Sequence, residues 1–305
     1  MTIQPELLQR RDLRQRDRER GWIFREIGVE PFIQCAGVRT LYGASNPSDE
    51  VIAAMNAAAE AFVDMDELAD AAGQPLAQLT GAEWGVITAG TAATLALATA
   101  ACIAGNNPEL MLRLPETSGP RRKVLIPSDQ GFSYEQAIRI AGGEIVSVAT
   151  VEKLAGALDG SAAMICLLAS ALPISSVLSL ARAGGVPILV EAAGLSPEMP
   201  DRWIRCGADL VVYAGGKYTR APQSTAIVLG RERLCKAIWW NGAPHQAFGR
   251  AMKVGKEEVV GAVVPLDRWI NFRTAANERD QWLPRLKRIE SQLNCKRSAE
   301  AVHGL

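Results

Sequence analysis

Several features that would fix a function class at once are missing from the sequence. The longest apolar stretch, residues 92–104, falls short of the roughly 20 residues that a membrane-spanning helix needs, and its alanine-rich composition predicts a buried helix. Lys and Arg together number 33, as do Asp and Glu. The formal net charge of zero therefore provides no general attraction to nucleic acid or to an anionic membrane.

Paired cysteines are missing as well. The cysteines are scattered with no C-x-x-C spacing, and the N-terminus lacks the apolar core of a signal peptide. We therefore predict no metal site, and we expect the protein to reside in a reducing cytoplasm. The six cysteines are Cys35, Cys102, Cys166, Cys206, Cys235 and Cys295.

Two common nucleotide-binding motifs are absent. The segment GRAMKVGKEE has five residues between Gly249 and Gly255 and a glutamate after Lys256, and no strand is expected immediately before it. It is therefore not a P-loop, whose spacing and final Ser or Thr serve the phosphates and Mg²⁺. No G-x-G-x-x-G opens a helix either.

From residue 27 onward, apolar strand-like runs alternate with helical segments. Strands of this kind, alternating with helices, predict an α/β fold with a mostly parallel sheet flanked by helices, an αβα sandwich of three layers. Ser48 is the expected N-cap of an early helix. The expected strands are the segment around Gly85–Thr88 and the runs RRKVLIPS, EIVSVA, AAMICLLA, VPILVEAAG, DLVVYAGGK and STAIVLG.

The chain is expected to divide into three regions. In the first region, arginines are interleaved with acidic residues, which is typical of a solvated helix with i,i+4 ion pairs. A tRNA-contacting arm is the alternative interpretation of these arginines. The regions are a charged N-terminal helix at 1–26, a large domain at 27–245, and a linker with a long helix at 246–305, the helix running from Lys256 to about Leu293.

Polar residues at the carboxyl ends of strands are the candidates for chemistry, because ligands of parallel sheets collect there. In TAGTAAT, residues 88–94, a strand ends in a small-residue turn and a helix begins. The free N–H groups of a helix N-terminus attract anions, and small residues such as Ala89 and Gly90 would let a phosphate come close. A plain tight turn is the alternative interpretation.

Two charged side chains follow neighbouring apolar runs. Glu191 ends the run in VPILVEAAG, and Lys217 follows two glycines in VVYAGGKYTRAPQS. Taken singly, the first is a capping or salt-bridged acid and the second a surface lysine. Taken with the anion site, they match a phosphorylated aromatic aldehyde with a ring nitrogen, because the lysine can capture the aldehyde and the carboxylate can keep the ring protonated. This is the outline of a pyridoxal 5'-phosphate site.

Longer segments resemble the fold-type I pyridoxal phosphate enzymes related to bacterial selenocysteine synthase and, more closely, to D-glucosaminate-6-phosphate ammonia-lyase. The resemblance implies the fold of aspartate aminotransferase. The matching segments run in order from about residue 27 to 261 and are GVEPFIQCAGVRTLYGAS, the stretch from AFVDMDELADAAG to TAACIAG, GVPILVEAAGLSP, GADLVVYAGGKYTRAPQSTAIVLGR and GRAMKVGKEEVVG.

The resemblance also implies roles for individual residues. Lys217 would bind the cofactor covalently, and Ala89, Gly90 and Thr91 would form its phosphate cradle. Glu191 stands where the family usually has an aspartate facing the pyridine nitrogen. Gln130 stands near the place where the family often has a histidine over the cofactor ring. The residues expected near substrate or phosphate, with ordinary surface charge as the alternative, are Arg220, Gln223, His245, Arg250, Lys253 and Lys256.

The sequence departs from the family pattern in three respects. Glu191 adds a methylene to the usual aspartate, and Ala214 replaces a serine that often reaches the phosphate. The small C-terminal domain of the family is expected to be incomplete, so that the chain is truncated or a partner subunit finishes the site. The resemblance implies a homodimer or larger homo-oligomer, because fold-type I sites form at subunit interfaces.

The activity implied by the resemblance is that of a lyase acting on a 2-amino-3-hydroxy acid such as D-glucosaminate 6-phosphate. Lys217 would remove the α-proton, and loss of the 3-hydroxyl and of ammonia would leave a 2-keto-3-deoxy acid. A selenium transferase acting on seryl-tRNA is one alternative, although the zero net charge disfavours tRNA as a partner. A non-catalytic scaffold is the other, and it would explain the departures at Glu191 and Ala214.

Overall fold

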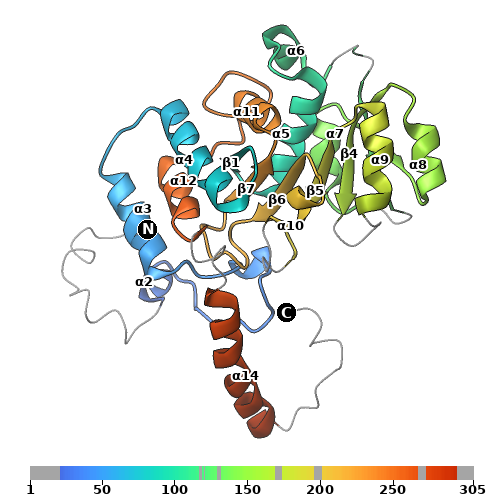
Figure 1. The fold of residues 1–305 in the computed structure, drawn as a ribbon. Coiled ribbons are helices and arrows are strands. Elements are labelled where there is room, and N and C mark those ends of the chain that lie inside the picture. Colours follow the sequence, from blue (N-terminus) through green and yellow to red (C-terminus); the bar gives the residue numbers. More distant parts are fainter. Residues whose placement is uncertain are drawn as a thin grey trace.

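A seven-stranded sheet lies at the centre of the computed structural model (Figure 1), in the order β1-β7-β6-β5-β4-β2-β3. All seven strands expected from the sequence are present. Their bounds are β1 Trp84–Thr88, β2 Lys123–Ile126, β3 Glu144–Ser147, β4 Ala162–Leu168, β5 Ile188–Glu191, β6 Leu210–Ala214 and β7 Ala226–Gly230. The structure describes residues 21–116, 119, 121–128, 132–168, 174–195, 201–266 and 273–293.

The sheet is mostly parallel, as predicted, with one exception. Strands β3, β2, β4, β5 and β6 pair in parallel, whereas β7 is antiparallel to both β6 and β1. Only residues 215–225 join β6 to β7, and this connection is too short for the helical crossover that parallel neighbours need. All strands except β7 therefore end at the same edge of the sheet.

Helix starts follow local capping chemistry. The Asp64 side chain accepts hydrogen bonds from the N–H groups of Asp66 and Glu67 at the start of α4. Ser48 is the N-cap residue of α3, as predicted, although its side chain makes no capping bond. The helices are α2 Trp22–Glu26, α3 Asp49–Ala59, α4 Met65–Thr80, α5 Thr91–Ala104, α6 Pro108–Arg113, α7 Glu135–Ile140, α8 Val151–Ala157, α9 Ile174–Gly184, α10 Arg202–Arg205, α11 Glu232–Trp240, α12 Lys256–Val263 and α14 Arg273–Leu293, with a 3₁₀ turn, η2, at Thr40–Tyr42.

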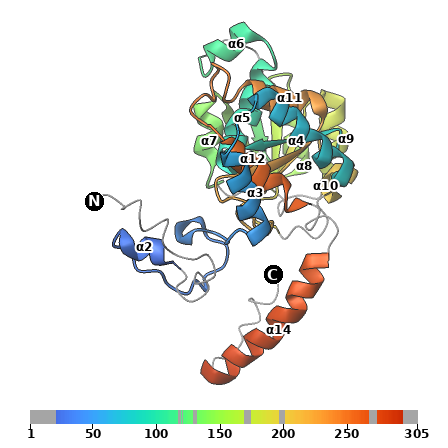
Figure 2. The same cartoon turned by 90° about the vertical axis from the view of Figure 1, so that its left-hand side faces the viewer.

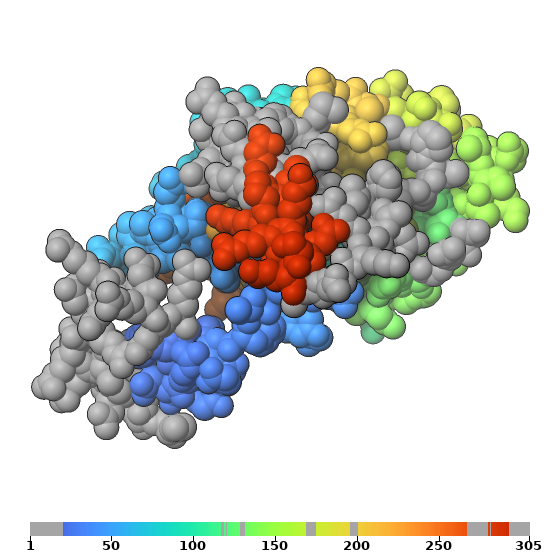
Figure 3. All heavy atoms as spheres, turned by 90° about the horizontal axis from the view of Figure 1, so that it is seen from below, coloured from blue at the N-terminus to red at the C-terminus, as the bar shows by residue number. Residues whose placement is uncertain are grey.

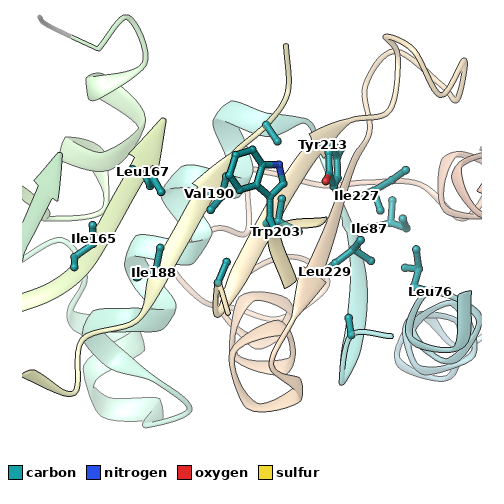
Figure 4. Close-up of a cluster of buried hydrophobic side chains, with 14 of the residues drawn as sticks. Leu76, Ile87, Ile165, Leu167, Ile188, Val190, Trp203, Tyr213, Ile227 and Leu229 are labelled. Carbon is teal, nitrogen blue, oxygen red and sulfur yellow. The ribbon is translucent and has the colours of Figure 1, made fainter. Parts of the chain in front are cut away.

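Two apolar layers enclose the sheet, because successive side chains of a strand point to opposite faces. Along β6, Val211 and Tyr213 pack on one face, and Leu210 and Val212 pack on the other. The first layer includes side chains of α4, α8, α9, α10 and α12, and the second includes those of α5, α7 and α11. Figure 4 shows the first layer, in which Trp203 of α10 lies among the side chains of the central strands. The predicted three-layer sandwich is confirmed.

The two ends of the described chain extend away from this sandwich. Figure 2 shows the segment around α2 and the helix α14 projecting from the body on the same side. The prediction of one long helix from Lys256 to Leu293 is wrong. Helix α12 ends at Val263, two residues before Pro265, whose ring and missing N–H do not suit a helix interior, and α14 begins at Arg273. Most of the predicted N-terminal helix, residues 1–20, lies outside the described residues.

None of the helices in the described ranges combines the length and the apolarity that crossing a membrane requires. Helix α12 packs against α3 and α4. Part of the predicted C-terminal region therefore belongs to the body of the fold, and the domain boundaries stay a prediction.

A glycine on α4 allows that helix to lie close against β1. A methyl group on Gly73 would overlap the indole of Trp84. We expect Gly73→Ala to lower the free energy of unfolding by about 1–2 kcal/mol, because overpacking against a rigid ring outweighs the gain of roughly 1 kcal/mol in helix propensity. Denaturant unfolding followed by circular dichroism measures this change.

Gly156→Ala on α8 is the matched control. A methyl group there meets no atom, so the same substitution should stabilise the protein by about 0.5 kcal/mol. Equal stabilisation by the two variants would contradict the close packing of α4 on β1.

Candidate active site

The shared carboxyl edge of the parallel strands lies on the lower side of the sheet in Figure 1. Residues 40–46 and the turn after β6 meet there through hydrogen bonds. Figure 3 views the molecule from this side, with α14 in front and the N-terminal segment beside it. The candidate residues Gly90, Thr91, Glu191 and Lys217 all follow or end strands at this edge.

The junction of β1 and α5 has the features of an anion site. Gly90 is the N-cap residue of α5, with a φ of 89° that favours glycine, and it offers no side-chain cap. The first N–H groups of a helix have no carbonyl partner within it. Thr94 Oγ1 lies 2.6 Å from Thr88 Oγ1, whereas Thr91 Oγ1 is buried and has no hydrogen-bond partner among the described residues. The backbone O of Ser224, just before β7, lies close to Gly90.

Glu191 is the last residue of β5 and is largely buried. Its Oε1 accepts a hydrogen bond of 2.9 Å from the N–H of Ala193. Burial raises the pKa of the Glu191 carboxyl, while the Ala193 N–H and the charge of Lys217 act to lower it. The Lys217 ammonium is therefore near enough to act electrostatically on this carboxylate, as a shared site requires.

Lys217 stands in the connection from β6 to β7, residues 215–225, which we call the lysine turn. The N–H of Gly215 donates to the carbonyl of Thr225 (2.9 Å). A side chain on Gly215 would overlap Thr225, and one on Gly216 would overlap the opposite backbone of the turn. Two glycines are therefore required before the lysine, because only they let the two strands of the turn approach so closely.

Other predicted site residues have partners of their own. Arg220 Nε donates to the carbonyl of Asn46 (3.1 Å), and Gln223 Nε2 donates to the carbonyl of Thr40 (2.9 Å). Gln130 lies outside the described residues. Arg220 and Gln223 thus connect the lysine turn to residues 40–46, and their contact with substrate stays a prediction.

His245 joins α11 to α4. Its Nδ1 lies 3.3 Å from the carbonyl O of Trp239, and its Nε2 lies 3.1 Å from Asp66 Oδ1. The same Asp66 oxygen accepts a hydrogen bond of 2.7 Å from Trp239 Nε1. Arg250 and Lys253 are exposed on the loop that follows. No contact in the described part of the chain links these three predicted residues to Lys217, and their substrate role stays a prediction.

Lys256 ties α12 to α3, because its Nζ donates to the carbonyl of Ala58 (2.7 Å) and also contacts Glu257. Ser45 lies beside the candidate site, and the sequence did not identify it. Both its N–H and its Oγ donate to the carbonyl of Gly216, next to Lys217. Contacts across such a sequence separation leave no periodic signal in the chain.

Known proteins are similar to this chain in sequence and in fold. No family model matches the chain. It is 33% identical over 268 residues to a D-glucosaminate-6-phosphate ammonia lyase of Salmonella typhimurium (strain 14028s / SGSC 2262), covering 83% of this chain and 71% of the relative. The chain belongs to this family. A solved structure of D-glucosaminate-6-phosphate ammonia-lyase superposes with a TM-score of 0.75 at 31% identity, covering 81% of this chain and 70% of that one.

A second relative of the chain has a different named activity. A 5'-C-glycyluridine monooxygenase-decarboxylase of Streptomyces sp is 32% identical over 284 residues, covering 87% of this chain and 69% of the relative. Fold type I is confirmed by the solved structures. Among them a serine palmitoyltransferase variant from S. paucimobilis with a bound PLP–myriocin aldimine shares the fold at 16% identity and a TM-score of 0.53, covering 76% of this chain and 60% of that chain.

The raised pKa of Glu191 predicts how stability depends on pH in the cofactor-free protein. A carboxyl whose folded-state pKa exceeds its ordinary value of 4.5 binds more protons when folded, so the folded state loses stability as pH rises through that range. We expect Glu191→Gln to abolish this loss. Its free energy of unfolding should therefore rise relative to that of the wild type as the pH increases above the ordinary carboxyl pKa of 4.5.

Glu135→Gln provides a control of opposite sign. Hydrogen bonds from Arg139 and from the Phe132 N–H lower the pKa of Glu135, so this carboxylate contributes stability above its ordinary pKa and loses it in acid. The free energy of unfolding of Glu135→Gln should therefore fall relative to that of the wild type as pH rises. The same pH trend in both variants would contradict the electrostatics of Glu191.

Proposed function

We propose that the protein is a pyridoxal phosphate-dependent lyase that removes the 3-hydroxyl and the amino group of a phosphorylated amino sugar acid such as D-glucosaminate 6-phosphate. The 3-hydroxyl would leave as water, and water would then hydrolyse the resulting enamine to a 2-keto-3-deoxy acid and ammonia. The observation that supports this most directly is that the buried carboxyl of Glu191, whose pKa the charge of Lys217 acts to lower, ends β5 at the edge where α5 begins. The similarity to the ammonia lyases supports the substrate class.

The described residues fit the phosphate of such a cofactor. Within the described part of the chain, Thr91 Oγ1 is buried without a partner, and a buried hydroxyl that lacks a hydrogen bond costs free energy. The N-terminus of α5 adds N–H groups and a favourable dipole, and Gly90 leaves room for a large anion. Gly90, Thr91 and the turn residue Ala89 would hold the phosphate, while Ala214 contributes no hydroxyl.

Pyridoxal phosphate, when bound, supplies an electron sink that stabilises negative charge at the substrate α-carbon. Glu191 would hold a proton on the ring nitrogen, and a buried carboxylate beside a cation does this more strongly than one in water. The Lys217 Nζ would attach the cofactor at rest and would take the α-proton during the reaction. The same Nζ can then give a proton to the 3-hydroxyl group and so assist its departure.

Association into a homodimer or a larger homo-oligomer is part of the proposal. Large apolar side chains of the N-terminal segment are exposed in the single chain, with Ile33 at 91%, Leu41 at 83% and Phe62 at 100% of full exposure. Association with a second copy would remove such side chains from water, which is favourable.

Covalent attachment of pyridoxal phosphate to Lys217 is the first test. We expect the purified protein to gain a visible absorbance band on addition of pyridoxal phosphate. The amine and the aldehyde condense with loss of water, and borohydride reduces the new carbon–nitrogen bond, so the peptide containing Lys217 should gain a stable mass. Lys217→Ala should lose both signals, and Lys153→Ala on the distant helix α8 should keep them. A wild-type protein without either signal would overturn the proposed cofactor.

Substrate choice is tested on the loaded enzyme. Ammonia release from D-glucosaminate 6-phosphate, without oxygen uptake, is the expected result. The 32% relative makes 5'-C-glycyluridine with dissolved oxygen the necessary comparison. Oxygen consumption with that compound, and no ammonia from the sugar acid, would replace the lyase assignment by the relative's chemistry.

Thr91→Val should change stability and cofactor affinity in opposite directions. The substitution removes a buried hydroxyl that has no partner, so the cofactor-free protein should become more stable by about 1 kcal/mol. It also removes one donor to the phosphate, so affinity for pyridoxal phosphate should fall by roughly tenfold. Thermal unfolding and fluorescence titration measure the two effects.

Thr94→Val is the control, because this threonine already has a partner. The loss of Thr94 Oγ1 leaves the buried Thr88 hydroxyl, at 2.6 Å, without that bond, so the cofactor-free protein should become less stable. If Thr91→Val also destabilises the cofactor-free protein, the Thr91 hydroxyl already has a partner and the cradle is misassigned.

A further inference from the structure

A short segment far from Lys217 in the sequence lies along the lysine turn. Residues 40–46, which we call the strap, contain η2 and precede α3. Three residues of the strap hydrogen-bond to the turn: Thr40 and Asn46 through their carbonyls, and Ser45 through its N–H and hydroxyl. No residue of η2 is buried. These polar bonds, rather than apolar burial, therefore hold the strap at this place.

The peptide bond that precedes Lys217 is fixed from both sides. Its carbonyl, on Gly216, accepts the N–H of Ser45 at 3.0 Å and the Oγ of Ser45 at 2.8 Å. Its N–H, on Lys217, donates to the carbonyl of Ala214 at 3.4 Å, which is a long and therefore weak bond. The orientation of this peptide plane depends mainly on the two donors of Ser45.

Two hydrogen-bond donors restrain the orientation of a carbonyl group more than one donor does. A carbonyl oxygen has two lone pairs, and a single donor fixes a distance while leaving the plane free to tilt. The second donor, Ser45 Oγ, occupies the other lone pair and restricts that tilt. Since the peptide plane sets where the Lys217 Cα–Cβ bond points, the hydroxyl restricts the range of positions open to Nζ.

Backbone strain in the same turn is consistent with this restraint. Arg220 adopts a φ of 55°, which a residue with a side chain rarely adopts, and its Nε bonds to the strap at Asn46. Thr219 Oγ1 donates to the carbonyl of Gly215 within the turn. Strained backbone persists where surrounding contacts over-determine it. The hydrogen bond from Arg220 to the strap is one of these contacts.

We propose that Ser45 is a positioning residue for Lys217, and that its hydroxyl holds the Gly216–Lys217 peptide so that Nζ meets the carbonyl carbon of an aldehyde cofactor. The proposal rests on the proposed function for the identity of the aldehyde. The hydroxyl itself touches neither cofactor nor substrate in this role. Removing it should slow capture of the aldehyde and leave phosphate and ring binding unchanged.

The test compares Ser45→Ala with Ser45→Thr, which keeps a hydroxyl, and with Ser48→Ala. Ser48 is the matched control because it lies nearby at the start of α3 and its side chain makes no capping bond. Two quantities are measured on each protein: the rate at which pyridoxal phosphate becomes fixed to Lys217 under borohydride, and the affinity for pyridoxamine 5'-phosphate, which has the phosphate and ring but no aldehyde.

We expect Ser45→Ala to reduce the rate of fixation about three- to tenfold, the range that corresponds to loss of one hydrogen bond. Its affinity for pyridoxamine 5'-phosphate should match the wild type. Ser45→Thr should restore most of the rate, and Ser48→Ala should change neither quantity. An unchanged rate in Ser45→Ala, or a parallel loss of pyridoxamine 5'-phosphate affinity, would overturn the positioning role.

Failure of the proposed function is distinguishable from failure of this inference. If the wild type does not fix pyridoxal phosphate at all, the cofactor assignment is wrong. Lys217 can then be probed by competitive acetylation with acetic anhydride in the cofactor-free proteins, with exposed Lys153 as internal reference. A change in the acetylation of Lys217 relative to Lys153 in Ser45→Ala supports the restraint on Nζ, and an unchanged ratio contradicts it.

Discussion

A parallel sheet has to be covered on both faces, and this requirement determines where polar chemistry can lie in the protein. Side chains along β6 alternate between two apolar layers, with Val211 in one and Val212 in the other. No charged group can be placed there at low cost. Charged and hydroxyl groups therefore gather at the strand ends, and the shared direction of the strands brings Thr91, Glu191 and Lys217 to one edge.

Several locally unfavourable features occur together at that edge. The pKa of Glu191 is raised by burial, Thr91 Oγ1 has no partner in the ranges that the structure describes, and Arg220 adopts a left-handed backbone conformation. Each of these costs stability in the cofactor-free protein, whereas an anionic phosphate and a protonated ring nitrogen would satisfy the first two. Costs concentrated at one place in an otherwise well-packed sandwich are typical of a binding site. Bound cofactor would therefore stabilise the fold as well as supply the chemistry.

Membership of this family establishes the fold, whereas the named activities of the relatives differ. Relatives of nearly equal identity are named as an ammonia lyase and as a monooxygenase-decarboxylase. A lysine, a carboxylate and a phosphate cradle serve the chemistry of the cofactor, and this chemistry is common to many reactions. Discrimination between substrates has to come from side chains around that core. Arg250 and Lys253 are exposed, and their role in substrate binding stays a prediction.

The sequence by itself determined the seven strands, the small-residue turn at Gly90 and the placing of Glu191 and Lys217 at strand ends, because apolar runs and glycines are local signals. It failed at the long helix, where Pro265 interrupts a pattern that otherwise reads as continuous. Only the tertiary structure decided that Ser45 bonds to the carbonyl before Lys217 and that His245 lies beside Asp66. These contacts depend on how the chain folds back on itself, and partners brought together by chain reversal have no periodic spacing to reveal them.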